Sequence, residues 1–482
     1  MFNLILKNFR SFKDQKFHFS KVNILIGENS SGKSSLLKFL LALKQTVQAP
    51  ASRDINLLFK GEFADLGSYK ESVYYQDDTL PIQFTFEFDI RYFDFYLNLI
   101  TARGKASLSG IHTKQVDKIK KAFPVNLNSL TSATYSVTKQ LSKHENITSV
   151  FFNDKVGRVE IIHTDRVKEP KQELIFGKSC TINYTDFISG ANFQFDEVEY
   201  TKEGFTSLIT GGSLFSKIKD ELLKRMNENN AEVETADIIW DRVAFLLITQ
   251  NYLKYFLDKI QYINPINTHP SRVYLYRDPK RTTSIDDIED VVEFFSNDND
   301  ATQKIQLEFV KILKKLGLAE DIEIIKEERL PVRELRVKVK DLLSNITDVG
   351  YGVSLQLPII LKALLSERIK SRNNSIILIE QPEIHLHPKL HAEIISVLLS
   401  LSKNTVYFIE THSEHIIRKL QLLVKDGKYN LNPDDITIHY LKRVKAKSKV
   451  STHVITENGI LNPGIPAGFF DNSFNLSRGL LD

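Results

Sequence analysis

The N-terminal part of the chain alternates apolar and polar positions in the manner of half-buried β-strands. An extended segment at 81–90 would place every second side chain on one face, and these side chains are all large and apolar. They are Ile82, Phe84, Phe86, Phe88 and Ile90. The sequence LILKNFRSFKDQKFHF alternates in the same way and leads into an apolar run at 22–26. The pattern predicts an antiparallel β lobe.

A β-hairpin is predicted within this lobe. The strand-like sequences SVFFND and GRVEIIHTD flank a turn at 153–157, where Asn, Asp and Gly are typical turn residues. The turn is short enough for the flanking sequences to pair directly with one another.

The hydrophobic period changes twice in the remainder of the chain. Apolar residues recur at helical spacing from about Ser213 to Ile263, which predicts a mainly helical insertion. After Pro331, strand-like and helix-like segments alternate, as in a parallel sheet with crossover helices. The predicted division is an N-terminal lobe at 1–200, an insertion at 201–330 and a C-terminal lobe at 331–482. The predicted fold class is α/β.

Composition narrows the class of protein without identifying a partner. The chain has 482 residues, 42% of them hydrophobic, which is enough for a sizeable core in more than one lobe. Its formal charge of +4 is too small to indicate nucleic-acid binding by itself. The single cysteine, Cys180, cannot form an internal disulfide. No apolar stretch is long enough to cross a bilayer, and MFNLILKNFRSFKD is unlike a secretory signal, so we expect a cytoplasmic protein without a membrane partner.

Two lysine-rich stretches leave DNA open as a partner. They lie at Lys114–Lys121 and Lys442–Lys449, next to the aromatic residues Phe123 and Tyr440. Charge runs of this kind usually mark a solvated face or the tip of a hairpin, and we favour that interpretation.

The strongest chemical motif is GENSSGKSS at 27–35, between an apolar strand and a helix-like segment. Its spacing is that of a P-loop, in which backbone N–H groups surround phosphates, lysine reaches the β and γ oxygens, and serine ligates magnesium. We therefore expect ATP and Mg²⁺ as ligands. The candidate nucleotide-binding residues are Gly27, Asn29, Gly32, Lys33, Ser34 and Ser35.

Acidic and polar residues at the ends of later strands are candidates for the rest of a catalytic site. Glu380 ends the apolar strand SIILIE and is the candidate metal residue, together with Ser34. Either Gln381 or Glu383 could position or polarise the attacking water, and the sequence does not decide between them. His412 follows the strand TVYFIE and is a candidate sensor of the γ-phosphate.

A second glycine-containing loop precedes another apolar helix. Gly350 and Gly352 free the backbone, and Ser354 and Gln356 lie near the expected helix N-terminus, which would suit an anion. One nucleotide cannot easily occupy this loop and the P-loop within one lobe. A head-to-tail dimer or higher homo-oligomer would instead place the loop on the partner's γ-phosphate.

These motifs together resemble an ABC-type ATPase head of the SMC, RecF and overcoming-lysogenization-defect group, within the bacterial AAA family ATPases. The resemblance extends over LKNFRSF, GENSSGKSS, ADLGSYKE, DVGYGVSLQ, IEQPEIHLHP, IETHSEHII and PAGFFD. It implies a mixed sheet with crossover helices, an antiparallel β lobe and a head-to-tail sandwich. By this resemblance, 27–34 is the Walker A motif, 350–356 the signature loop, Glu380 the Walker B acid, 384–388 the D-loop and His412 the switch histidine. Gln76 is a weaker match to a magnesium-contacting glutamine.

The histidines in and after the predicted D-loop also allow a metal-site interpretation. His387 and His391 have the i, i+4 spacing of zinc ligands, and His385 lies nearby. Because Pro388 places His385 and His387 before the helix, and the D-loop resemblance accounts for them, we favour a site without zinc.

The resemblance also implies a biological role. Overcoming-lysogenization-defect proteins carry a C-terminal Toprim nuclease, but here no glutamate and Asp-x-Asp cluster is evident after His412. The chain is therefore expected to be an ATPase without nuclease activity, similar to the ATPase subunits of two-gene bacterial antiphage systems. Its expected partners are a second copy of itself, a separately encoded effector such as a Toprim-like nuclease, and a phage-derived trigger protein. Two alternatives stay open: a DNA-repair or DNA-end-binding ATPase of the RecF kind, and the ATPase of a Septu-like system with an HNH nuclease.

Overall fold

The computed structural model describes these residues: 2–49, 57–89, 130–138, 146–153, 157–164, 178–186, 192–200, 253, 255–263, 269–276, 285–297, 299–327, 329–368, 375–401 and 405–465. The chain forms two compact units whose segments interleave along the sequence. Unit 1 comprises Met1–Phe19, Ser35–Asp258 and Arg443–Lys449, and unit 2 comprises Ser20–Ser34, Lys259–Lys442 and Val450–Asp482. The division of the sequence at 200 and 330 stays a prediction.

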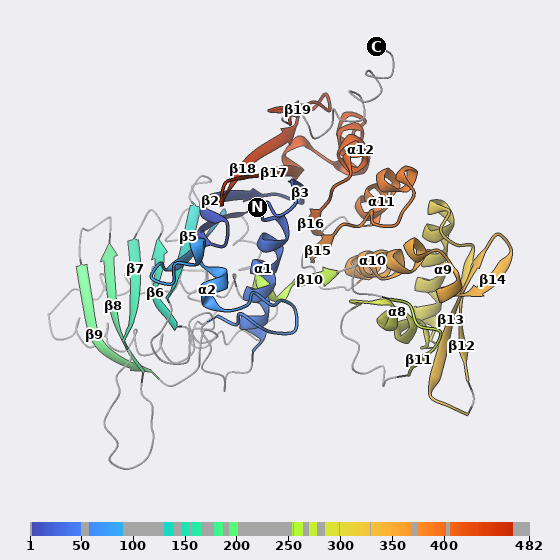
Figure 1. Cartoon of the computed structure of the whole chain (residues 1–482), viewed down its shortest axis with the longest axis horizontal. Helices are drawn as coiled ribbons and strands as arrows, with labels where there is room; N and C mark the ends of the chain where they lie inside the picture. The colour runs from blue at the N-terminus through green and yellow to red at the C-terminus, as the bar shows by residue number, and fades with distance from the viewer. Residues whose placement is uncertain are drawn as a thin grey trace, which may run out of the picture. The chain divides into compact units, whose positions relative to one another are not determined.

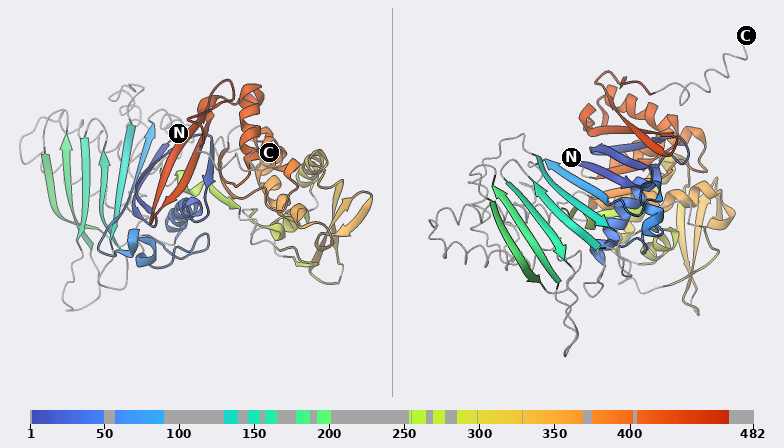
Figure 2. Two further views of the ribbon diagram at one scale, coloured as in Figure 1. Left: turned by 45° about the horizontal axis from the view of Figure 1, so that its top comes forward. Right: turned by 60° about the vertical axis from the view of Figure 1, so that its left-hand side comes forward.

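Unit 1 contains an eight-stranded antiparallel sheet (Figure 1). Its strands in spatial order are β2 (Phe12–Phe19), β1 (Phe2–Phe9), β4 (Ile82–Asp89), β5 (Leu130–Thr138), β6 (Asn146–Asn153), β7 (Gly157–Thr164), β8 (Lys178–Asp186) and β9 (Asn192–Tyr200). Figure 2 shows these strands side by side from two further directions. The predicted antiparallel lobe is confirmed.

The predicted β-hairpin is also confirmed. Phe152 of β6 pairs with Val159 of β7, and Asn153 pairs with Arg158. The residues between them at 154–156 lie outside the described part of the chain.

The apolar face of β4 forms part of the core of unit 1. Ile82, Phe84 and Phe86 are buried, as the alternation predicts, whereas the side chains of Phe88 and Ile90 lie outside the described part. The Phe84 ring lies 5.2 Å from that of Phe39 on α1 (Lys33–Gln48), measured between centroids. Two short helical segments, α2 (Tyr69–Ser72) and η1 (Tyr74–Gln76), precede β4.

Unit 2 contains a seven-stranded mixed sheet. Its strands in spatial order are β10 (Ile260–Ile263), β15 (Ile376–Glu380), β16 (Val406–Glu410), β3 (Val22–Gly27), β17 (Ile436–Val444), β18 (Lys447–Ile455) and β19 (Leu461–Asn462). The strands from β10 to β17 are parallel, and β18 and β19 pair antiparallel. All residues of β3 and β15 are buried, which explains their continuous apolar sequences.

Crossover helices connect the parallel strands of unit 2, as predicted. They are α10 (Tyr351–Arg368), α11 (Pro388–Leu401) and α12 (Glu414–Lys425), which are neighbours in Figure 1. Short 3-10 segments follow α12 at η5 (Lys428–Asn430) and η6 (Pro433–Asp435). Because parallel strands end at the same edge of a sheet, this connectivity gathers the residues that follow β3, β15 and β16.

A smaller four-stranded sheet and a helix pair complete unit 2. The strands are β11 (Tyr274–Leu275), β12 (Asp321–Lys326), β13 (Val332–Val339) and β14 (Leu342–Asn345), and the helices are α8 (Ile288–Phe295) and α9 (Asp300–Leu316). Capping residues define both helix starts, with Asp287 in a capping box on α8 and Asn299 capping α9. The segment η4 (Ile346–Asp348) then leads into α10.

The predicted helical insertion requires one correction. The helical pattern was expected to continue to Ile263, but residues 260–263 form β10 and pair with β15. This strand exists through a pairing with a segment distant in sequence, which local periodicity does not reveal. Most of the predicted helical region, at 201–252, lies outside the described residues.

The basic segment near the C-terminus lies at the tip of a hairpin, which is the arrangement favoured from the sequence. Strands β17 and β18 flank it, and Lys442, Lys445 and Lys449 are exposed. The other basic stretch, at 114–121, lies outside the described residues. Within the described ranges, no helix combines the length and apolar character that a bilayer span requires.

Candidate functional site

The predicted P-loop connects the buried strand β3 to the start of α1. Lys33 is the first residue of α1, is 4% exposed, and donates hydrogen bonds to the carbonyls of Gly27 (3.1 Å) and Glu28 (2.9 Å). Burial lowers the pKa of Lys33, and the nearby carboxylate of Glu410 opposes that shift. The ammonium group therefore lies against the loop that should surround the phosphates.

The backbone of this loop requires glycine at its first position. Gly27 has a φ of +140°, and a Cβ added there would collide with the backbone carbonyl of Leu441 on β17. Asn29 is exposed and Gly32 is half-buried. Ser35 accepts a hydrogen bond from the Arg10 guanidinium at 3.2 Å.

The carboxyl ends of β15 and β16 bring two glutamates together beside the P-loop. Glu380 and Glu410 are direct neighbours in the parallel register, and both are buried. The Ser34 hydroxyl donates to Oε1 of Glu410 at 3.0 Å. The hydroxyl of Tyr262 on β10 donates to Oε1 of Glu380 at 2.9 Å.

Sequence reasoning missed Glu410 and Tyr262. Glu410 ends the strand TVYFIE, two residues before His412, and a carboxylate at a strand end that follows a P-loop motif is the signal that could have identified it. Burial raises the pKa of Glu410 to about 7, with Ser34 lowering it and Glu380 raising it. Burial and the Glu380 carboxylate raise the pKa of Tyr262, which keeps its hydroxyl protonated as a donor.

Gln381 and Glu383, the two candidates for water activation, both lie in the turn between β15 and α11. The backbone N–H of Gln381 donates to the carbonyl of Glu410 at 2.7 Å. Oε1 of Glu383 accepts from the Thr411 hydroxyl (2.7 Å) and from the backbone N–H of His412 (2.8 Å). Glu383 is 7% exposed, so its side chain holds the turn after β16 from inside the protein.

His412 lies near the P-loop lysine, as a switch histidine would require. Burial and the positive charge of Lys33 lower the pKa of His412, which favours the neutral imidazole. The structure therefore gathers Lys33, Ser34, Glu380, Glu383 and His412 at one edge of the sheet, together with the unexpected Glu410.

The predicted signature loop requires a correction. The loop was expected to precede an apolar helix, but α10 already begins at Tyr351 and includes Gly352, Ser354 and Gln356. The Ser354 hydroxyl donates to the carbonyl of Tyr351 at 2.8 Å and is nearly fully buried. Gln356 is buried and donates to the carbonyl of Pro382 at 2.7 Å.

The two glycines at the start of α10 have different surroundings. Gly352 packs on the predicted D-loop, because an added Cβ would lie 2.5 Å from the carbonyl oxygen of His385. Gly350 is exposed, and an added Cβ would meet nothing within 4 Å. Of the four predicted signature residues, Gly350 is therefore the one that a partner could reach without rearrangement of this segment.

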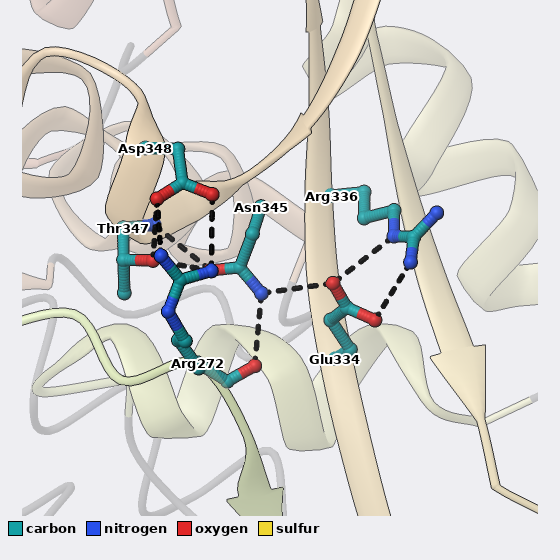
Figure 3. A network of polar contacts seen from close by, with 6 residues as sticks. All are labelled: Arg272, Glu334, Arg336, Asn345, Thr347 and Asp348. Atoms are coloured by element: carbon teal, nitrogen blue, oxygen red, sulfur yellow. Dashed lines mark hydrogen bonds and ion pairs between the residues drawn. The ribbon is translucent and has the colours of Figure 1, made fainter.

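A polar network fixes the turn before α10 (Figure 3). Arg272 forms an ion pair with Asp348 at 2.6 Å, and its backbone carbonyl accepts a hydrogen bond from Asn345 at 2.9 Å. Asn345 also donates to Glu334 at 2.9 Å, and Glu334 pairs with Arg336 at 3.0 Å. The network connects β13, β14, η4 and the segment before β11, and it ends three residues before the start of α10.

The predicted D-loop histidines form no metal cluster in the described part of the chain. His391 contacts Ser413 (3.1 Å) and the carbonyl of Leu386 (3.0 Å), while the His385 ring lies 5.0 Å from that of Tyr351. Gln76 lies exposed in η1 of unit 1, so its predicted contact with magnesium in unit 2 stays a prediction.

The residues at the strand ends fit a magnesium ion. Magnesium prefers oxygen ligands and is usually held by one or two carboxylates together with phosphate oxygens. Ser34, Glu380 and Glu410 supply a hydroxyl and two carboxylates, and Oε2 of Glu410 is buried without a hydrogen-bond partner. These oxygens are the side-chain groups that would hold the ion.

Comparison with protein families places the chain in a known class. A model of the AAA ATPase domain matches residues 1–417, and one of a protein of unknown function (DUF3696) matches residues 431–480. The chain therefore belongs to the AAA ATPase domain family, which makes it an ATPase with a nucleotide site. No curated protein matches it. The predicted α/β fold is confirmed, with a mixed sheet, crossover helices and an antiparallel β lobe.

Solved structures of SMC heads resemble the chain distantly. An SMC head bound to the C-winged helix domain of ScpA has a TM-score of 0.37 at 14% identity, covering 93% of this chain and 96% of that one. An Smc head with an extended coiled coil, bound to the C-terminal domain of ScpA derived from Pyrococcus furiosus, has a TM-score of 0.36 at 12% identity, with 100% of both chains covered. The SMC head from Thermotoga maritima has a TM-score of 0.31 at 12% identity, covering 93% and 97%.

Proposed function

We propose that this ATPase binds Mg²⁺-ATP at the carboxyl ends of β3, β15 and β16 and hydrolyses it to ADP and phosphate. The observation that carries the proposal is the convergence of Lys33 and Ser34 with the buried carboxylates of Glu380 and Glu410. Lys33 would exchange its bonds to the loop carbonyls for the β and γ oxygens of the nucleotide. A bound magnesium ion would supply electrostatic stabilisation of the phosphate charge.

The attacking water would be held beyond the carboxyl ends of β15 and β16. Gln381 could orient it through its side-chain amide, as glutamines do in GTPases, and Glu383 could accept its proton through Oε2, which has no hydrogen-bond partner. Oε1 of Glu383 is already occupied by Thr411 and the His412 N–H, so proton acceptance there would disturb the switch segment. His412, kept neutral near Lys33, would contact the γ-phosphate.

A purified chain tests this function directly. We expect magnesium-dependent phosphate release from ATP, and loss of nucleotide binding in Lys33→Ala, because the variant lacks the point charge on the β and γ oxygens. Lys38→Ala is a matched control, because Lys38 lies on the same helix and is not part of the loop. Unchanged ATP affinity in Lys33→Ala would refute the P-loop assignment.

The finer biological role is that of a sensor subunit in a bacterial antiphage system. The resemblance is greatest to the ATPase of the PARIS system, in which the effector would be a Toprim-like nuclease encoded separately. A trigger protein from the phage would shift the ATPase towards one state, and only a state that binds the effector differently could release or activate it. The support is the ATPase family together with the sequence resemblance.

Co-expression with the neighbouring genes tests this role. The chain should co-purify with the neighbouring gene's product and show no nuclease activity alone, and its Lys33→Ala variant should fail to transmit the signal. An HNH nuclease as neighbour would instead favour the Septu-like alternative. Magnesium-dependent DNA cleavage by the isolated chain would refute the proposed division of labour.

The exposed basic tip between β17 and β18 supports the RecF-like alternative. Lys442, Lys445 and Lys449 are all exposed and could contact a phosphate backbone. If they do, affinity for DNA ends should fall steeply with salt, and a triple substitution of these lysines by glutamine should reduce the salt dependence. Salt-independent or absent DNA binding would leave the antiphage role favoured.

A further inference from the structure

The carboxylate that contacts the P-loop serine belongs to Glu410, at the end of β16. Ser34 donates to Oε1 of Glu410 at 3.0 Å, whereas the predicted metal residue Glu380 accepts a hydrogen bond from Tyr262 at 2.9 Å. Both carboxylates lie at the same level of the sheet, because Glu380 and Glu410 are paired in register. The hydroxyl expected to bind magnesium is therefore already directed towards Glu410.

The surroundings of Glu410 show that this carboxylate lacks a full set of partners. The residue is only 4% exposed, and its Oε2 is buried without a hydrogen-bond partner. Burying a carboxylate oxygen without a compensating contact costs free energy, so such an atom calls for a proton or a cation. Lys33 is close enough to act on Glu410 electrostatically, but its ammonium group donates hydrogen bonds to the carbonyls of Gly27 and Glu28.

We propose that Glu410 is a magnesium ligand of the nucleotide site, acting with Ser34 and Glu380. This inference rests on the proposed ATPase function and adds a residue to the metal site that the motif at 376–380 alone does not supply. The three side chains offer the hydroxyl and two carboxylates that magnesium accepts beside phosphate oxygens. Glu380 keeps the Tyr262 hydroxyl as its orienting partner, and Glu410 keeps Ser34 beside it.

A magnesium titration of nucleotide binding tests the assignment without measuring turnover. Affinity for a fluorescent ATP analogue would be measured in EDTA and at increasing magnesium concentrations, for the full chain and for Glu410→Gln. The glutamine keeps an oxygen that can accept from Ser34 but removes the charge. We expect the half-saturating magnesium concentration to rise by about tenfold or more, with metal-free affinity unchanged or tighter because a negative charge beside the phosphates is lost.

Two further variants separate the possible outcomes. Glu457→Gln makes the same change in an exposed turn after β18 and should leave the titration unchanged. Glu410→Asp keeps the charge on a shorter side chain, so the half-saturating magnesium concentration should rise less than in Glu410→Gln. This variant replaces Glu410→Gln in the experiment if the glutamine variant does not fold. A normal magnesium requirement in folded Glu410→Gln, with a raised requirement in Glu380→Gln, would overturn the inference. Absence of nucleotide binding by the unmodified chain would instead refute the proposed function.

Discussion

Lys362 donates a hydrogen bond from its ammonium group to the backbone carbonyl of Tyr262, 2.9 Å away. Lys362 lies on α10, the helix that begins with the predicted signature residues, and Tyr262 lies on β10 and donates its hydroxyl to Glu380. Tyr262 is therefore contacted by α10 through its main chain and contacts the predicted metal residue through its side chain. This contact provides a physical connection between α10 and the nucleotide site.

The first prediction concerns the stability of this connection. Lys362 is 2% exposed and pairs with the half-exposed Asp286 at 2.6 Å. Lys362→Ala should lower the free energy of unfolding by roughly 2 to 4 kcal/mol, because it leaves a cavity and a carbonyl without its donor. Lys362→Met preserves most of the side-chain volume, and the half-exposed Asp286 can be hydrated again. The free energy of unfolding should therefore fall less in Lys362→Met than in Lys362→Ala. Denaturant unfolding would measure both, and equal losses would show that the charged contact matters more than the packing.

The second prediction concerns the orientation of Glu380. Tyr262→Phe removes only the hydroxyl that donates to Oε1 of Glu380. We expect kcat for ATP hydrolysis to fall by about tenfold, with KM and metal-free nucleotide affinity nearly unchanged, because Tyr262 acts on the carboxylate and not on the nucleotide. Tyr276→Phe is a control outside this contact. A rise in KM with unchanged kcat would contradict a positioning role.

The sequence was sufficient to locate the P-loop and the strands around it. Glycine spacing at Gly27 and Gly32, and the uninterrupted apolar strands that end at Glu380 and Glu410, are local signals that need no knowledge of the fold. The alternation at Ile82, Phe84 and Phe86 was equally local, and these side chains are buried as expected.

Features that depend on contacts between distant segments could not be read from the sequence in the same way. Tyr262 lies 118 positions from Glu380, within a segment whose apolar residues fit a helix until β10 pairs with β15. Likewise, glycines suggested a loop at Gly350 and Gly352, but Gly352 lies inside α10, where an added Cβ would lie 2.5 Å from the carbonyl oxygen of His385. In both places tertiary contact overrides the local preference.

The third prediction concerns the proposed head-to-tail dimer. Gly350 is exposed, and a Cβ added there would have no neighbouring atom within 4 Å. Gly350→Arg should therefore fold as a monomer and retain nucleotide binding. If the N-terminal end of α10 meets the partner's nucleotide, the added side chain should prevent ATP-dependent dimer formation. Light scattering of a hydrolysis-deficient background with ATP would measure this.

Two controls sharpen the dimer experiment. Gly350→Ala should dimerise normally, because it adds only a methyl group where nothing lies within 4 Å. Ser354→Arg should also block the dimer, but Ser354 is buried and bonded to Tyr351, so that variant is expected to lose stability as well. Full ATP-dependent dimerisation of Gly350→Arg would argue against a composite site at this helix end.

The last prediction separates the two candidates for water activation. In Glu383→Gln the amide oxygen can still accept from Thr411 and from the N–H of His412, so the fold and ATP binding should be retained. If Glu383 accepts the proton of the water, turnover should fall by roughly a hundredfold or more. If Gln381 positions the water instead, Gln381→Ala should cause the larger fall in turnover. This variant should keep its fold, because the hydrogen bond between the backbone N–H of Gln381 and the carbonyl of Glu410 does not involve the side chain. Single-turnover hydrolysis with both variants distinguishes these cases, and near-normal rates in both would place the water elsewhere.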